Sequence, residues 1–196
     1  MRVKLKEILD IKVGYQNRTV IKEDSNGDCR IIQSKDFNDD EKLNTANHIR
    51  FAPEYSPDKH FVFPNDVLFC AKGRKNFAYA MTEKLENTVV ANNFFILRPN
   101  KKRINSKFLE WTLNHGSFLK RLKMFLQGTR IPFVSRGAFE NLTIDVPDLK
   151  TQENIAKIIS LAEKEKHLCQ RIIELRDKYI QENCRVAIKT RSQYEK

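Results

Sequence analysis

Two short segments of the sequence place basic and amide side chains beside a glycine. They are Lys72, Gly73, Arg74, Lys75, Asn76 and Gln127, Gly128, Thr129, Arg130, and Arg136 follows closely. Arg can pair with guanine through two hydrogen bonds, Asn or Gln can pair with adenine in the same way, and glycine lets a backbone approach its ligand closely. These segments are therefore the candidates for base contacts if the partner is DNA. The alternative for Gly73 and Gly128 is an ordinary turn glycine.

The charge of the chain also favours a polyanionic partner. The sequence has 36 Lys and Arg against 25 Asp and Glu, a net charge of +11, and such an excess suits nucleic acid or acidic lipid. Residues 100–140 hold nine basic and two acidic side chains. Six of these basic residues are candidates for phosphate contacts: Lys101, Lys102, Arg103, Lys120, Arg121 and Lys123. The alternative for each is a solvated surface position. We expect the acidic loop 36–41 to lie away from DNA.

Catalytic and metal-binding patterns are not evident in the sequence. It contains no glycine-rich phosphate loop, no G-x-S-x-G and no H-E-x-x-H, and its four histidines and four cysteines are scattered without metal-ligand spacing. Asp66 follows a turn, as a nuclease carboxylate would, but Glu83 and Lys84 are adjacent and lack the alternation of an E-x-K strand. We therefore expect no catalytic residue, metal or cofactor on this chain. With no apolar stretch long enough for a signal peptide or a membrane span, we expect a cytoplasmic protein with reduced thiols.

The elements that must position these residues are mostly strands in the first hundred residues. Short apolar segments such as 30–33, 59–63 and 67–70 alternate with Asn, Asp, Gly and Pro clusters. The turn at 25–28 predicts a hairpin between Val20-Ile21 and Arg30-Ile31. The β-branched and aromatic run from Thr88 to Leu97 predicts one buried strand.

The remaining sequence predicts helices and one more strand. Apolar residues recur every three or four positions from 108 to 126 around Asn114-His115-Gly116, which indicates two helices with a break. Residues 141–147 alternate like a strand. From about Thr151 the chain has no Gly or Pro, and we expect Thr151 to begin one long helix. The fold class is therefore α+β, a mixed, mainly β domain at 1–149 followed by one long coiled-coil helix at 150–196.

The long helix carries a heptad repeat. Its apolar seam is Ile158, Leu161, Leu168, Ile172, Leu175, Tyr179 and Val186, interrupted by Glu165 and Glu182. Roughly forty residues at 1.5 Å each would extend about 60 Å, farther than the preceding domain is wide. We expect the seam to pack on a helix of another copy or another chain. The alternative is a helix that folds back over its own domain.

The order of motifs resembles the DNA-specificity (S) subunit of type I restriction-modification systems. The most diagnostic stretch is the last, a strand ending in Val146-Pro147, a short loop, and then Gln152, Ile155 and Ala156 at the start of the long helix. Earlier motifs in the same order are 4–8 leading to Val13-Gly14, 64–69 leading to 72–74, 89–99, and 128–132. The resemblance covers essentially the whole chain. It departs from the family at Val3, where an aromatic residue is usual, and at Tyr15 to Asn17, where a second glycine is usual. The departure leaves the path of the first turn open.

The resemblance implies a non-catalytic subunit of a methyltransferase and endonuclease complex. A full-length member has two target-recognition domains, each followed by a long helix, and this chain has one of each. It therefore looks like half a specificity subunit, which would read one half of a bipartite sequence in double-stranded DNA. The helix would dock methyltransferase (M) subunits, with the restriction (R) subunit as a further partner, and AdoMet is expected only on the M subunits. Antiparallel helices of two copies would form a homodimer and predict an interrupted palindrome.

Two other functions remain open at this point. The chain could be a non-catalytic interaction protein that binds restriction-modification or other defence components as a decoy or regulator. It could also be a general RNA-binding protein. Selection of DNA from a randomised pool separates these readings, because only a specificity subunit should recover a split motif.

Overall fold

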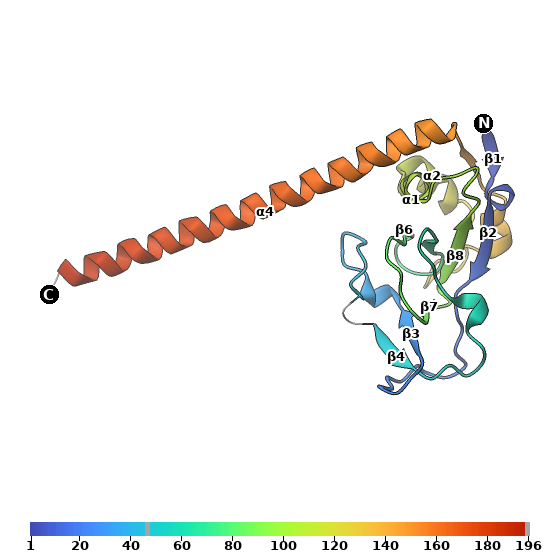
Figure 1. Cartoon of the computed structure of the whole chain (residues 1–196), viewed down its shortest axis with the longest axis horizontal. Helices are drawn as coiled ribbons and strands as arrows, with labels where there is room; N and C mark the ends of the chain where they lie inside the picture. The colour runs from blue at the N-terminus through green and yellow to red at the C-terminus, as the bar shows by residue number, and fades with distance from the viewer. Residues whose placement is uncertain (46–47, 195–196) are drawn as a thin grey trace. The chain divides into compact units, whose positions relative to one another are not determined.

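The computed structural model describes residues 1–45 and 48–194, and the chain divides into two compact units, Met1–Glu153 and Asn154–Lys196. The first unit contains all the strands and the short helices (Figure 1). The second unit consists of most of one long helix. The α+β class and the mainly β domain followed by a long helix, both expected from the sequence, are confirmed.

The largest sheet has four antiparallel strands in the order β2-β8-β5-β6. These strands are β2 (Leu9–Val13), β8 (Phe94–Pro99), β5 (Val67–Cys70) and β6 (Ala78–Ala80). Every side chain of β5 is buried, because both faces of the strand are covered: Leu68 packs in one cluster with Ile32 and Val90, and Phe69 packs on Phe139. The register pairs Cys70 with Phe94 and Val67 with Leu97. The turn after β5 and the loop after β8 therefore lie at opposite ends of the sheet.

Two smaller sheets complete the β structure. In one, β3 (Cys29–Ile32) lies between antiparallel β4 (Ile49–Phe51) and parallel β7 (Thr88–Val90). In the other, β1 (Arg2–Lys4) pairs with β9 (Thr143–Asp145), so that the two ends of the domain meet. Short 3-10 helices occupy Leu5–Glu7, Ser34–Asp36 and Asp58–His60.

The core joins these sheets through apolar side chains from distant parts of the chain. One cluster includes Ile32 of β3, Leu68 of β5, Val90 of β7 and Ile96 of β8, all fully buried. Gly14 lies where β2 meets the end of β7, and a Cβ atom there would come within 2.2 Å of the Ala91 carbonyl oxygen. Only glycine permits this close approach.

Three short helices precede β9, and each is capped by a polar side chain. Asn105 accepts from the backbone N–H groups of Lys107 and Phe108 at the start of α1 (Ser106–Asn114), and His115 accepts from Ser117 N–H at the start of α2 (Gly116–Lys123). Ser135 caps α3 (Arg136–Glu140). The helix break expected at residues 114–116 is confirmed, because His115 ends one helix and caps the next.

The long helix α4 (Leu149–Tyr194) has 46 residues and begins earlier than expected. Asp148, and not Thr151, caps it. The Asp148 carboxylate accepts from the Thr151 backbone N–H at 2.9 Å and from the Thr151 hydroxyl at 2.7 Å. The cap therefore precedes the helix by one residue, and Thr151 lies in the first turn.

Two strand expectations are wrong. The hairpin between Val20-Ile21 and Arg30-Ile31 does not form, because β3 pairs with β4 and β7. The run from Thr88 to Leu97 is two strands in different sheets, β7 and β8, separated by a turn in which Phe94 N–H donates to the Ala91 carbonyl. In both cases long-range pairing overrides the local pattern.

Candidate nucleic-acid interface

The two segments with the candidate base contacts lie side by side. Lys72 forms a β-bridge with Phe133, and the Gly73 N–H donates to the Pro132 carbonyl at 3.1 Å. Gln127 and Phe133 exchange two backbone hydrogen bonds of 2.8 and 2.9 Å, which close residues 127–133 into a hairpin. We call these segments the 72–76 turn and the 127–133 hairpin. The fold brings them together although they are far apart in the sequence.

The hairpin needs its glycine for conformational reasons. Gly128 has a φ of +83°, and an added Cβ would meet the Ile131 carbonyl oxygen at 3.0 Å. A left-handed residue in so tight a turn favours glycine. The turn exposes Thr129, Arg130 and Ile131 at its tip, so glycine here shapes a projecting loop.

An open pocket of about 460 Å³ lies where the turn, the hairpin and the end of α2 meet. Its lining includes the basic residues Arg74, Lys75 and Lys123, and the amides of Asn76 and Asn114. Three predicted DNA-binding residues of the turn and one of α2 thus share one concave surface. This surface combines positive charge with hydrogen-bonding groups, the pairing that a DNA reader needs.

One acidic residue lines the same pocket. Glu41 lies there with its carboxylate 2.5 Å from the Lys75 ammonium. Glu41 belongs to the acidic loop 36–41, which we expect to lie away from DNA, yet it lines the candidate surface. The Glu41 carboxylate therefore balances the charge of Lys75, one of the predicted DNA-binding residues, in the free protein. Sequence spacing could not reveal this pair, because Glu41 and Lys75 lie on separate loops.

The two amides of the pocket have structural partners. Asn76 donates from Nδ2 to the Cys70 carbonyl at 2.9 Å and so closes the turn. Asn114 accepts from the Ala78 N–H at 2.7 Å and donates to the Ala78 carbonyl at 2.9 Å, which ties the end of α1 to β6. Burial raises the pKa of the Cys70 thiol below them to about 11, so this thiol stays neutral near pH 7. The Asn76 hydrogen bond thus attaches the 72–76 turn to the end of β5.

The predicted phosphate contacts at 101–103 lie elsewhere. They follow the last residue of β8, whereas the 72–76 turn adjoins its first residue, because Ala71 and Lys72 donate backbone hydrogen bonds to the Asn93 carbonyl. Five steps of about 3.3 Å along β8 separate the two ends of this strand by roughly 17 Å. Lys101 and Lys102 are exposed, but the Arg103 guanidinium donates to the Glu7 carbonyl at 2.8 Å. Residues 101–103 are thus separate from the basic residues that line the pocket.

Two other predicted arginines also have partners within the domain. Arg121 donates to the Thr143 carbonyl at 3.2 Å and lies over the Phe118 ring. Arg136 forms an ion pair with Glu140 at 2.5 Å on α3. Lys120 and Lys123 on α2 are exposed. The basic stretch therefore mixes residues available to a ligand with residues that hold the fold.

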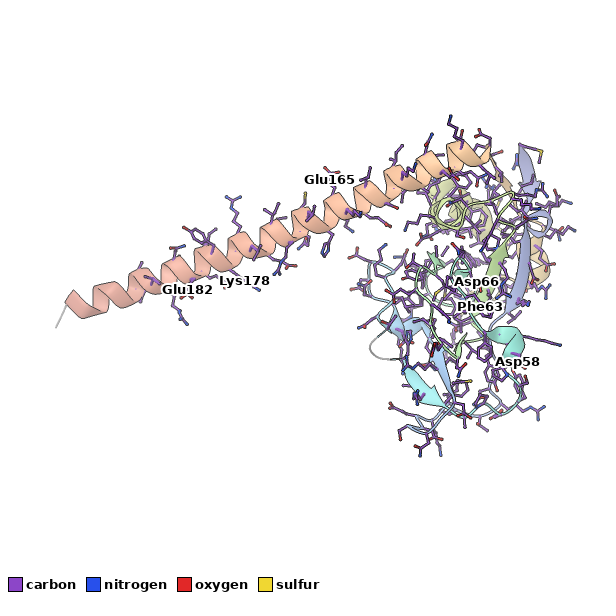
Figure 2. The ribbon with its side chains drawn as sticks, in the orientation of Figure 1. Asp58, Phe63, Asp66, Glu165, Lys178 and Glu182 are labelled. Atoms are coloured by element: carbon purple, nitrogen blue, oxygen red, sulfur yellow. The ribbon has the colours of Figure 1, made fainter. Side chains whose placement is uncertain are left out.

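Asp66 is not arranged as a nuclease carboxylate. It is buried, and it accepts hydrogen bonds from Arg98 Nε at 2.9 Å, Arg98 Nη2 at 2.8 Å and the Phe63 N–H at 2.9 Å. The Arg98 guanidinium also lies 4.8 Å from the centre of the Phe63 ring. Figure 2 shows Asp66 and Phe63 together in the domain. The hydrogen bonds to Asp66 raise the pKa of Arg98. This is a structural ion pair, and the described residues contain no group of three potential metal ligands.

Four exposed apolar residues lie within the hairpin or shortly before it in the sequence, and they were not anticipated from the sequence. They are Met124, Phe125, Ile131 and Phe133. The helical period from 108 to 126 predicts burial for Phe125, but α2 ends at Lys123 and the chain then turns toward Gln127. For Ile131 and Phe133, the signal that could have identified them is their position on either side of Pro132.

The seam of α4 is exposed throughout its described length. The relative exposure of its seven apolar residues ranges from 50% at Leu175 to 71% at Tyr179. Ile173, Ile180 and Ile188, which the heptad pattern does not include, are exposed as well. Pairing through this seam stays a prediction. Within the described residues, α4 and the other helices lack a stretch apolar and long enough to cross a membrane.

Comparison with known proteins connects this geometry to one family. A family model described as the type I restriction modification DNA specificity domain matches residues 1–176. No curated protein matches the sequence.

Solved structures have the same fold at low sequence identity. The S subunit of a type I restriction-modification system from M. genitalium is 16% identical with a TM-score of 0.59, over 91% of this chain and 42% of that one. The HsdS subunit from Thermoanaerobacter tengcongensis is 17% identical with a TM-score of 0.59, over 84% and 37%. A chain from a study of complex assembly and conformational transition of the type I R-M system is 18% identical with a TM-score of 0.61, over 87% and 40%. The present chain spans about two fifths of each.

Proposed function

Since this chain belongs to the type I restriction modification DNA specificity domain family, we propose that it is a sequence-specific DNA-binding half-subunit without catalytic activity. It would read one half of a bipartite target in a type I restriction-modification system. The observation that carries the proposal is the meeting of the 72–76 turn and the 127–133 hairpin at one basic pocket. Two loops with arginine on a rigid β scaffold suit base reading, since rigid elements hold side chains in register with the groove.

The proposed division of labour assigns base contacts to the loop tips. Arg74 and Arg130 are exposed, and no described residue forms a salt bridge with either. They are the leading candidates for pairing with guanine. Lys101, Lys102, Lys120 and Lys123 would neutralise phosphates without regard to sequence. Arg103, Arg121 and Arg136 are weaker candidates than the sequence suggested, because their guanidinium groups already have partners.

The long helix would supply the spacing and the partner contacts. A domain that reads one half-site needs a second domain at a fixed distance, and a long helix with an exposed apolar seam can provide it by pairing with another such helix. The same helix would dock M subunits, which would carry AdoMet, and through them the R subunit. Leu168→Glu with Leu175→Glu should abolish association of the full chain with its helix partner, as measured by light scattering.

The decisive experiment is selection of duplex DNA from a randomised pool by the full chain. We expect one conserved half-site, or two half-sites at a fixed distance if a second helix is bound. Arg74→Ala should relax one position of that motif. Recovery of no motif at any salt concentration would refute specific recognition.

A second function has one observation in its favour. The exposed seam of α4 would serve equally well in a decoy or regulator that binds defence components through the helix alone. In that case the selection recovers no motif, while the Leu168→Glu and Leu175→Glu variant loses its protein partners. The selection separates the candidates, because the helix variant loses its protein partners in both cases.

A further inference from the structure

A row of basic residues runs beside the apolar seam of α4. Its members recur at every seventh position and are Lys157, Lys164, Arg171, Lys178 and Arg185. All five side chains are exposed. Figure 2 labels Lys178 along the helix between Glu165 and Glu182. We call this set the basic row. Seven residues are two helical turns, so the row keeps one position relative to the seam over its whole length.

The basic row occupies the position that faces a partner helix. With Ile158 and Leu161 as the first two seam positions of a heptad, Lys157 directly precedes the first. Residues in this place flank the buried seam and contact the flanking row of the partner, where charge sets partner choice and orientation. A single basic residue here would be uninformative. Five in five successive heptads amount to a consistent electrostatic preference.

A second antiparallel copy of α4 fits this row poorly. In an antiparallel pair of heptad helices the equivalent flanking rows face each other. Every heptad from Lys157 to Arg185 has a basic residue at this position. A shift of the pairing by one heptad therefore again places basic residues of one helix opposite basic residues of the other. Like charges held across an interface select against that pairing. Arg171 and Arg185 have neighbouring carboxylates on their own helix, Glu174 and Glu182, but these reduce the repulsion only in part.

A parallel second copy fits no better. In a parallel pair the basic row would face the row on the other side of the partner's seam. That row holds Ala162, Cys169, Arg176 and Asn183. None of these is acidic, and Arg171 would face an arginine.

The two acidic residues within the seam point to the same conclusion. The antiparallel register that sets Leu161 against Val186 of a second copy also sets Glu165 against Glu182, and a parallel register sets each Glu against itself. A shift by one heptad places these carboxylates against Leu or Ile. Glu182 has an ion-pair partner on its own helix, Arg185 at 3.4 Å, but a carboxylate moved into a desolvated seam still loses its hydration, which is costly. The seam therefore favours a partner with basic or polar residues at these two levels.

We propose that α4 pairs with a helix of a different chain, one that carries carboxylates along the row facing the basic row and basic or polar residues opposite Glu165 and Glu182. Another surface of this chain is a poor candidate for the acidic partner, because the whole sequence has a net charge of +11. The inference rests on the proposed function in one respect only, the need of a half-subunit for a second helix. It replaces the homodimer expected from the sequence with a heteromeric pair.

Two synthetic peptides test the proposal against the full chain. One has the sequence of residues 151–188, and the other differs from it only by Glu at the five positions of the basic row. We expect the acidic peptide to bind about tenfold or more tightly than the unaltered one, with the difference shrinking at high salt because the contacts are exposed. The chain alone should be a monomer at micromolar concentration by light scattering. Equal affinity, or tighter binding of the unaltered peptide, would overturn the proposal.

The Glu substitutions could also change how helical the free peptide is. A charge-reversed protein controls for this effect, because both proteins meet the same two peptides. The protein variant K157E/K164E/R171E/K178E/R185E should prefer the unaltered peptide, because the facing charges are then opposite. If both proteins prefer the same peptide, charge on this row does not choose the partner and the proposal fails. DNA selection is scored separately. A recovered half-site without peptide discrimination would refute only the pairing inference, and peptide discrimination without a motif would refute only DNA reading.

Discussion

The Gln152 side chain accepts a hydrogen bond from the Asn105 backbone N–H at 2.9 Å. Gln152 is fully buried in the first turns of α4, and its Nε2 donates to the carbonyls of Arg103 at 3.1 Å and Pro147 at 2.8 Å. One amide therefore satisfies three backbone groups from two segments. It fastens the start of α4 to the loop that caps α1. Glutamine suits this position because its amide both donates and accepts.

Loss of this amide should destabilise the recognition domain. Gln152→Ala leaves the Asn105 N–H and two buried carbonyls without partners, so we expect the free energy of unfolding to fall by about 1–3 kcal/mol. Urea unfolding of the full chain measures it. The neighbouring exposed residue provides the control, because Glu153→Ala should change stability by less than about 0.5 kcal/mol. Equal effects of the two substitutions would contradict the role assigned to Gln152.

The Asp66–Arg98 ion pair should contribute more to the free energy of unfolding than a surface ion pair does. Asp66→Asn removes the charge that Arg98 faces, and we expect a loss of about 2–3 kcal/mol, less than for a fully buried pair because Arg98 is partly exposed. The comparison is Glu174→Gln, which breaks the exposed pair with Arg171 at 3.2 Å on α4 and should cost at most about 1 kcal/mol. Thermal unfolding of both variants measures the difference. If Asp66→Asn proves as stable as Glu174→Gln, the Asp66–Arg98 pair contributes no more than a surface ion pair.

Arginines at the loop tips and lysines beyond β8 should differ in their effects on DNA binding. Arg74→Ala or Arg130→Ala should cost about 1–3 kcal/mol on the selected sequence and relax preference at one base, whereas Lys102→Ala should weaken all sequences alike and make the salt dependence shallower by about one charge. Competition with single-base variants at several salt concentrations separates the two. Unchanged preference in the Arg74 variant would remove that residue from the reading surface.

Removal of Glu41 should strengthen DNA binding. Its carboxylate pairs with Lys75 in the pocket, so Glu41→Gln frees one cation, and we expect tighter binding to all duplexes with a salt slope steeper by about 0.9. Asp39→Asn, in the same loop outside the pocket lining, is the control. Weaker binding together with lost preference at one base pair would show instead that Glu41 accepts from cytosine.

The cap of α4 should make its first turn depend on pH. Hydrogen bonds from Thr151 lower the pKa of Asp148, so the folded carboxylate is favoured over the unfolded one. The stabilisation is present above the pKa of the unfolded carboxyl, about 3.9, and is lost as the pH falls through the lowered folded pKa. The Thr151 backbone amide should be protected from hydrogen exchange by this bond at pH 6. The protection should be lost near pH 2, where Asp148 is protonated. Asp148→Asn should keep protection without this pH dependence.

The sequence allowed good prediction where local chemistry decides the structure. Helix α4 could be foreseen because a long segment without Gly or Pro has few alternatives, and the break at His115 because an imidazole beside Gly116 can cap a helix. The position of the α4 cap was wrong by three residues. Both Asp148 and Thr151 can act as caps, and local sequence does not choose between them.

Prediction failed where partners lie far apart in the chain. The strand at Arg30 and Ile31 pairs with segments near Ile49 and Thr88, so its adjacent turn was misleading. Arg103 and Lys102 are exposed neighbours of the same charge, yet the Arg103 guanidinium donates a hydrogen bond to the Glu7 carbonyl. Nothing in the local sequence distinguishes them, since the difference comes from β2 and β8 pairing along their whole length.

The register of β8 also sets a length scale on DNA. The two ends of β8 are roughly 17 Å apart, and consecutive base pairs rise by 3.4 Å, so a duplex lying along β8 would present about five base pairs between the two basic groups. That is half a helical turn, over which a strand passes from one side of the duplex to the other. If both groups hold phosphates, the domain spans one groove and clamps its two walls. The half-site that it reads is then limited to the few base pairs between those walls.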